Sequence, residues 1–202
     1  MAPRHYAYTA IVVAYLLAAA PAYAGPCDDG QHRAASGRHG PGPAPLIVGD
    51  SVLLGAVPQV ARAGFEVDAK GCRTIDQGLA ILRERRRAGR LPGLVALALG
   101  TNFTITEGDV RRALAVVGPE RVLVLVSPRD DRGADGAGAR AVRAAGRRWP
   151  RRVRVVDWAG ASDGHGGWRA GDGIHLTADG AAAMARMLRA VRDLRVELRW
   201  SS

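Results

Sequence analysis

Several loops of the sequence carry side chains that together could perform acyl transfer. Ser51 has a hydroxyl that can attack an acyl carbon once a base removes its proton, and His175 can be that base near neutral pH. Asp172 stands three residues before His175 and can accept a hydrogen bond from the second ring nitrogen. Asn102 offers a side-chain amide N–H that could bind an oxyanion. These residue types predict a serine nucleophile with a histidine base.

Each of these residues also has an ordinary structural interpretation. An Asp-Ser pair before an apolar stretch, as at Asp50-Ser51, is typical of helix capping. Asp172-Gly173 is a common turn sequence, and a single histidine before a helix is often solvated. The chemical interpretation therefore depends on whether the fold brings these loops to one place.

The elements that must position these residues alternate between strands and helices. Short apolar runs predict buried strands, and periodic apolar positions predict helices between them. The expected strands are residues 46–48, 65–67, 94–99, 121–126 and 153–156, and the expected helices are residues 52–62, 75–87, 107–116, 138–149 and 177–194. This alternation predicts one three-layer α/β/α domain over residues 46–195, built on a five-stranded parallel sheet with right-handed crossovers.

The carboxyl ends of parallel strands meet at one edge of a sheet, where ligands of such folds bind. Residue 51 follows the first expected strand, residue 102 the third, and residues 172–175 lie beyond the fifth. The turn at residues 71–72 follows the second strand and would bring a further backbone N–H to this edge. We therefore expect Ser51, Asp172 and His175 as catalytic residues, and an oxyanion site formed by Ser51, Gly71, Cys72 and Asn102.

The N-terminal segment has the pattern of a secretory signal. A short basic lead, Arg4-His5, precedes a mostly apolar run from Tyr8 to Ala20 and a small-x-small cleavage site at residues 22–24. We expect cleavage after residue 24, export from the cytoplasm, and no membrane span in the mature chain. An uncleaved anchor is the alternative, although the apolar run is short for a span.

The two ends of the mature chain carry no apolar periodicity. Residues 25–45 are rich in Gly and Pro and predict a flexible leader, or at most an ordered strap, and residues 196–202 are expected to form a C-terminal tail. Cys27 in the leader and Cys72 in the domain are the two cysteines of the chain. In an oxidising compartment they can form a disulfide, and two free thiols are the alternative.

The chain is strongly basic, with 29 Lys and Arg residues against 19 Asp and Glu. A nucleic-acid partner is one interpretation, but the arginines are spread along the sequence rather than gathered in one tract, so we expect none. An anionic cell-envelope polymer remains a possible partner. His32 and His39 have no cluster of ligands at metal-binding spacing. We expect a monomer that needs no metal and no organic cofactor.

Four blocks of the sequence, in order, resemble those of the SGNH (GDSL-type) hydrolase family. The blocks are Gly49-Asp50-Ser51, Gly71-Cys72-Arg73, Leu99-Gly100-Thr101-Asn102 and Asp172-Gly173-Ile174-His175, within residues 46–190. The segments at residues 67–69, 156–158 and 172–177 are similar to the SGNH domain fused to membrane acyltransferases that O-acetylate cell-wall and surface polysaccharides. Two positions depart from the family pattern, because Cys72 stands near the place of the oxyanion glycine and Phe103 follows Asn102.

The resemblance implies a flavodoxin-like sheet and an exported serine esterase that hydrolyses small O-acyl (acetyl) esters on a carbohydrate or cell-envelope polymer. Alternatives are an O-acyltransferase that moves the acyl group to a glycan hydroxyl, and a catalytically silent envelope-binding domain. Hydrolysis is favoured at this point because no multi-span acyl-supplying half is visible in the sequence. Trp158, Trp168 and Phe103 lie in expected loops near the site and could stack on a sugar ring, with burial as the alternative for Trp158.

Overall fold

The structure is a computed structural model that describes residues 27–130 and 135–200. The expected signal segment, residues 1–24, lies outside the described residues.

The described part of the chain forms one six-stranded sheet. Its strands are β1 (Gly30–Arg33), β2 (Leu46–Gly49), β3 (Glu66–Lys70), β4 (Leu94–Ala98), β5 (Val122–Val126) and β6 (Val153–Val156). The spatial order is β1-β3-β2-β4-β5-β6, with β2 to β6 parallel and β1 antiparallel to β3. The prediction of five parallel strands in an α/β fold is therefore confirmed.

The sixth strand was not predicted. β1 comes from the segment expected to be a flexible leader or at most a strap, and the sheet is consequently mixed rather than wholly parallel. Its sequence, Gly-Gln-His-Arg, has no large apolar side chain, and all four residues are exposed. Backbone pairing with β3 holds this edge strand, so hydrophobic periodicity gives no sign of it.

Helices connect the parallel strands as expected, with some differences at their ends. They are α1 (Ser51–Leu54), α2 (Val57–Arg62), α3 (Ile75–Arg87), α4 (Glu107–Val117), α5 (Ala137–Arg148), α6 (Trp158–Asp163), the 3₁₀ turn η1 (Gly166–Trp168) and α7 (Ala178–Trp200). The single helix expected over 52–62 is broken at Gly55-Ala56, before a proline in the first turn of α2. α6 and η1 were not predicted, and α7 ends at Trp200 rather than at residue 194.

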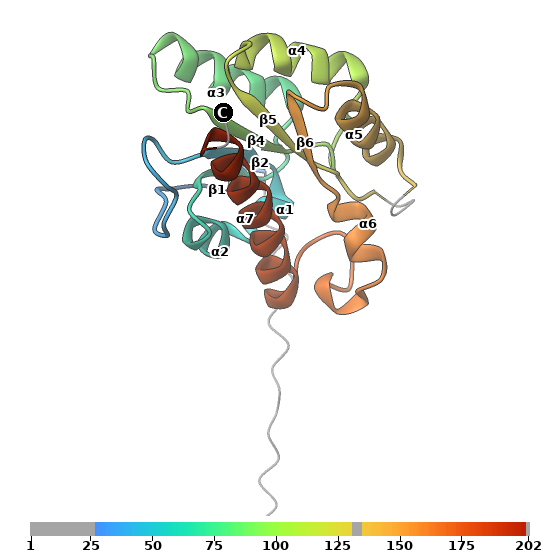
Figure 1. The fold of residues 1–202 in the computed structure, drawn as a ribbon. Coiled ribbons are helices and arrows are strands. Elements are labelled where there is room, and N and C mark those ends of the chain that lie inside the picture. Colours follow the sequence, from blue (N-terminus) through green and yellow to red (C-terminus); the bar gives the residue numbers. More distant parts are fainter. Residues whose placement is uncertain (1–26, 131–134, 201–202) are drawn as a thin grey trace, which may run out of the picture.

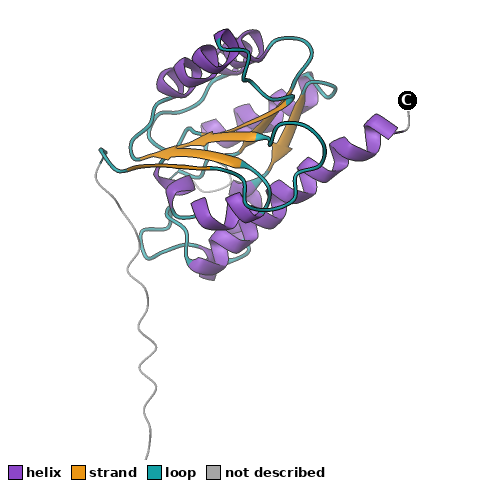
Figure 2. Ribbon diagram, turned by 90° about the vertical axis from the view of Figure 1, so that its left-hand side faces the viewer, coloured by secondary structure: helices purple, strands orange, loops and turns teal. Residues whose placement is uncertain are grey.

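The sheet is covered by helices on both faces (Figures 1 and 2). α3, α4 and α5 pack on one face, and α2 and α7 pack on the other. The side chains of β2 alternate between the two cores: Ile47 belongs to the cluster under α7, whereas Leu46 and Val48 belong to the cluster under α3. Burial on both faces explains the continuous apolar runs by which the parallel strands were predicted.

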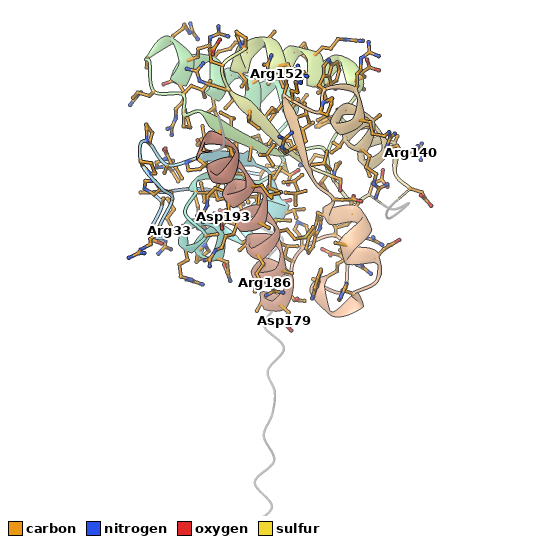
Figure 3. The ribbon with its side chains drawn as sticks, in the orientation of Figure 1. Arg33, Arg140, Arg152, Asp179, Arg186 and Asp193 are labelled. Atoms are coloured by element: carbon orange, nitrogen blue, oxygen red, sulfur yellow. A yellow bond between two sulfur atoms is a disulfide. The ribbon has the colours of Figure 1, made fainter. Side chains whose placement is uncertain are left out.

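None of the described helices, including the 23 residues of α7, combines the length and the apolar character needed to cross a bilayer. The arginines are distributed around the molecule. In Figure 3, Arg33, Arg140, Arg152 and Arg186 lie on different sides of the ribbon. The positive charge of the chain is therefore spread over several surfaces.

Candidate active site

The structure brings three of the predicted residues into one hydrogen-bonded chain. Ser51 is the first residue of α1, immediately beyond the carboxyl end of β2. Its Oγ lies 3.0 Å from Nε2 of His175, and Nδ1 of His175 lies 2.6 Å from Oδ2 of Asp172. Residues 51 and 175 are 124 positions apart in the sequence, so the fold itself creates this arrangement.

The loop that carries Asp172 and His175 holds the carboxylate in place through its own backbone. Oδ1 of Asp172 accepts hydrogen bonds from the N–H of Ile174 at 2.9 Å and of His175 at 3.0 Å. Burial alone would raise the pKa of Asp172, but the hydrogen bonds from the His175 ring and these two N–H groups lower it to about 2. Asp172 is therefore ionised at neutral pH, which favours the imidazole tautomer protonated at Nδ1 and leaves Nε2 free to accept the Ser51 proton.

Gly49 allows the nucleophile helix to begin directly at the end of β2. A Cβ at this position would lie 2.5 Å from the Leu53 side chain and 3.0 Å from the carbonyl oxygen of Ala98. Only glycine therefore fits between the end of the strand and the first turn of α1. This close packing sets the position of Ser51 relative to β4.

Asp50 is a buried carboxyl next to the nucleophile, and its place in the sequence predicts only a helix cap. It caps α1, since its Oδ1 accepts the Val52 N–H at 3.1 Å, and its Oδ2 accepts the Thr101 N–H at 3.4 Å. Burial, at 1% exposure, raises the pKa of Asp50 to about 6 in spite of these two N–H donors. Asp50 thus connects the nucleophile turn with the loop that carries Asn102.

The expected oxyanion residues are not equally available. The Gly71 N–H donates to the carbonyl oxygen of Asp29 at 2.8 Å, so we leave Gly71 out of the oxyanion site. Cys72 follows in a left-handed conformation, with φ of 54°, and is linked by a disulfide to Cys27. The alternative of two free thiols is therefore excluded in this structure. Asn102 is exposed in the loop after β4, directly after Thr101.

Arg73 is a second residue near the site to which sequence reasoning gave no role. Its side chain is 7% exposed, and its guanidinium donates to the carbonyl oxygen of Gly49 at 3.0 Å. It also donates to the backbone carbonyl and to the carboxylate of Asp68, each at 2.6 Å. Arg73 therefore ties the turn after β3 to the strand that delivers Ser51. An arginine directly after a predicted turn gives no sign of burial.

The three aromatic residues expected to bind a sugar differ in exposure. Phe103 is 62% exposed and Trp168 is half-buried, but Trp158 is 1% exposed. Trp158 begins α6 and packs in the core, which agrees with the alternative of burial, so we leave it out of the proposed sugar-binding surface. Its ring stacks on Trp168 at 5.8 Å between centroids, and Trp168 stacks on His165 at 3.9 Å. Trp158 also lines a cavity of about 20 Å³ beside Asp50.

Comparisons with known proteins place these observations in context. No protein-family model matches the chain. The peptidoglycan O-acetyltransferase OatA of Listeria monocytogenes is 30% identical over 150 residues, which cover 73% of this chain and 24% of that protein. The chain therefore spans about a quarter of the length of this curated relative.

Two solved structures have the same fold. The C-terminal catalytic domain of Streptococcus pneumoniae OatA, solved with a methylsulfonyl adduct, matches with a TM-score of 0.64 at 20% identity, over 73% of this chain and 90% of that one. A family 3 carbohydrate esterase of Clostridium thermocellum matches with a TM-score of 0.53 at 14% identity, over 76% of this chain and 98% of that one. At these identities the likeness concerns the fold.

Proposed function

We propose that this chain, which has the fold of the SGNH (GDSL-type) hydrolases, is an exported serine enzyme. In the proposed reaction it takes a small acyl group from an ester onto Ser51 and then passes this group to a hydroxyl of a cell-envelope glycan. The observation that carries this proposal is the hydrogen-bonded chain from Ser51 through His175 to Asp172. The N-terminal signal pattern and the disulfide support an extracytoplasmic location.

In the first half of the proposed reaction, Ser51 becomes acylated. Oγ of Ser51 attacks the carbonyl carbon of the donor ester while Nε2 of His175 takes the hydroxyl proton. Asp172 accepts the Nδ1–H of the ring and stabilises the imidazolium that forms. The backbone N–H groups of Ser51 and Cys72 and the amide of Asn102 bind the oxyanion. His175 then gives its proton to the departing alcohol, which leaves the acyl group on Ser51.

In the second half, an acceptor hydroxyl attacks the acyl-enzyme. His175 removes the proton of the acceptor as its oxygen attacks, and the tetrahedral intermediate forms in the same oxyanion site. As the intermediate collapses, the bond between the acyl carbon and Ser51 Oγ breaks and His175 returns the proton to Oγ, which regenerates the enzyme. A sugar hydroxyl as acceptor gives transfer, whereas water gives hydrolysis. The exposed Phe103 offers apolar surface to a sugar ring near this site, whereas the half-buried Trp168 already stacks on Trp158 and His165.

Transfer is our first candidate and hydrolysis our second, which reverses the order expected from the sequence. The relative that is 30% identical to this chain is named as a peptidoglycan O-acetyltransferase. The carbohydrate esterase shares only the fold, at 14% identity. The sequence similarity therefore favours a glycan acceptor over water.

The test uses p-nitrophenyl acetate as the acyl donor, with and without chito-oligosaccharide or peptidoglycan fragments as acceptors. We expect p-nitrophenol release and, by mass spectrometry, acetylated oligosaccharide in preference to free acetate. Ser51→Ala should lower turnover by at least about 10³-fold, because the nucleophile is lost. Free acetate as the sole product would favour the hydrolase.

The same measurements separate both enzymatic candidates from a catalytically silent domain. A fluorophosphonate probe should label Ser51 in the wild-type protein and leave Ser51→Ala unlabelled. Unchanged ester turnover in Ser51→Ala, or a wild-type protein that neither labels nor turns over ester, would overturn the proposed function.

A further inference from the structure

An N-terminal segment of this chain, which we call the strap (residues 27–33), runs antiparallel along β3 to the edge of the candidate site. The pairing begins at Arg33 with Val67 and reaches Gly30 with Lys70. Beyond it, the carbonyl oxygen of Asp29 accepts the N–H of Gly71 at 2.8 Å. The disulfide between Cys27 and Cys72 closes the end of this ribbon. The strap is thus fastened to the turn after β3 by a backbone ladder and one covalent bond.

The core contributes little to holding the strap in place. The four residues of β1 and both cysteines are exposed. An edge strand without buried side chains is held mainly by its backbone pairing, and it opens more readily than strands in the core of a sheet. The disulfide is therefore the strongest restraint on the part of the strap nearest the site.

Cys72 has a backbone conformation that explains why such a restraint matters. Among the residues that the structure describes, Cys72 alone combines a side chain with a left-handed φ, at 54°. Glycine adopts this conformation freely, whereas a residue with a Cβ adopts it at a cost. A cysteine at a position suited to glycine needs a second interaction to hold its backbone there, and the bond to Cys27 supplies one.

The turn lies beside the nucleophile. In the parallel pairing of β2 with β3, Gly49 is opposite Ala69, so Ser51 and Cys72 both follow the carboxyl ends of adjacent strands. Arg73, the next residue, donates a hydrogen bond to the carbonyl oxygen of Gly49, two residues before Ser51. The disulfide to the strap and the hydrogen bond from Arg73 to the nucleophile strand therefore both restrain the turn at Cys72.

We propose that the Cys27–Cys72 disulfide positions a catalytic group, because it holds the turn at Cys72 in its left-handed conformation and so keeps the Cys72 backbone N–H beside the oxyanion formed at Ser51. The inference rests on the proposed function for the reaction itself. Cys27 is then a positioning residue that acts through Cys72, and the N-terminal strap belongs to the catalytic apparatus as well as to the fold.

The experiment compares three forms of the protein: wild type, Cys27→Ser/Cys72→Ser, and Cys27→Ser/Cys72→Gly. Both variants lack the disulfide, so a difference in activity between them cannot come from the loss of the covalent bond. Only the second allows residue 72 to keep the left-handed conformation without strain. Ester turnover is measured below the melting temperature of all three, which circular dichroism establishes first.

We expect Cys27→Ser/Cys72→Ser to lose about 10- to 100-fold in kcat with little change in KM, because an oxyanion donor acts in the transition state. Cys27→Ser/Cys72→Gly should recover most of that kcat although its melting temperature stays low. Equal kcat in all three forms would show that the bridge only stabilises the fold, and would overturn the inference. Equal losses in both variants would also overturn it.

Hydrogen–deuterium exchange of residues 70–74 provides a measurement that does not depend on turnover. We expect exchange in this segment to be at least about tenfold faster in Cys27→Ser/Cys72→Ser than in wild type, because the turn opens more often without the bridge. Unchanged exchange would contradict the positioning role. Failure of the proposed function itself is recognised separately, from unchanged turnover in Ser51→Ala.

Discussion

The two sides of the candidate site are built in different ways. On the side that we propose carries the acid–base chemistry, Asp172 and His175 share one short loop, and the carboxylate accepts hydrogen bonds from groups within three residues of sequence. On the side that we propose binds the oxyanion, the turn at Cys72 is fixed by a disulfide to a residue 45 positions away and by an arginine that reaches the neighbouring strand. The first side is a local motif, whereas the second depends on distant parts of the chain. Substitutions on the local side should therefore lower activity with little change in stability, whereas substitutions on the other side should lower both.

Asp172→Asn tests the local side, and we expect the largest effect from it. The amide cannot accept the ring Nδ1–H and both backbone N–H groups as the carboxylate does, so the imidazole loses its tautomer and orientation. We expect kcat to fall by about 10³- to 10⁴-fold while the free energy of unfolding changes little. Rates with p-nitrophenyl acetate and urea unfolding measure the two quantities.

Asp179→Asn is the matched control for that substitution. Asp179 is exposed in the first turn of α7, close in sequence to the same loop (Figure 3), and its substitution removes the same charge. We expect activity within about twofold of wild type. A comparable loss in Asp179→Asn would mean that the charge of this region, rather than the contact with His175, supports the reaction.

Arg73→Met tests the long-range side and should affect stability and rate together. The substitution leaves the Asp68 carboxylate without its guanidinium and removes the hydrogen bond to Gly49, all in a largely buried place. Loss of one partner of such a pair costs about 3–5 kcal/mol of unfolding free energy. We also expect kcat to fall by about tenfold or more, since the turn at Cys72 and the nucleophile strand lose a direct connection.

Arg85→Met, in α3, provides the comparison, because Arg85 also pairs with a carboxylate of β3. Arg85 pairs with Glu66 at the start of β3, far along the strand from the site, and Glu66 keeps His32 as a second partner. We expect a smaller loss of stability and an unchanged kcat. If the two substitutions lower kcat equally, Arg73 stabilises the fold without positioning the site.

The same contrast explains what the sequence could and could not predict. The five parallel strands follow from apolar runs such as Val122–Val126, and the meeting of Ser51 with Asp172 and His175 follows from the common edge of those strands. β1 has no large apolar side chain, and its place is determined by pairing and by Cys27, so periodicity does not find it. The burial of Trp158 and Arg73 depends on packing between elements distant in sequence, which residue type alone does not indicate.

Asp50 joins the nucleophile turn to the loop that carries Asn102, and its pH dependence provides a further test of how the site is held. Its carboxyl accepts N–H groups from the nucleophile turn and from the Asn102 loop, and burial raises its pKa to about 6 from the ordinary 3.8. The folded protein therefore binds this proton more tightly than the unfolded chain. The resulting stabilisation is complete below pH 3.8 and is lost as the pH rises through 6, by about 3 kcal/mol. Urea unfolding of wild type and Asp50→Asn should show their difference shrinking by about this amount between pH 4 and pH 7.

Asp157 caps α6 after β6 much as Asp50 caps α1 after β2, but its pH dependence should have the opposite sign. Burial tends to raise the pKa of Asp157, yet hydrogen bonds from Arg143 and Ser127 bring it below the ordinary value. Its contribution to stability is therefore present above pH 3.8 and is lost as the pH falls through the lowered pKa. As the pH falls, the difference in unfolding free energy between wild type and Asp157→Asn should thus become smaller, whereas the difference between wild type and Asp50→Asn should become larger. If the stability differences of the two variants changed with pH in the same direction, burial would not give the Asp50 carboxyl a pH dependence different from that of the Asp157 helix cap.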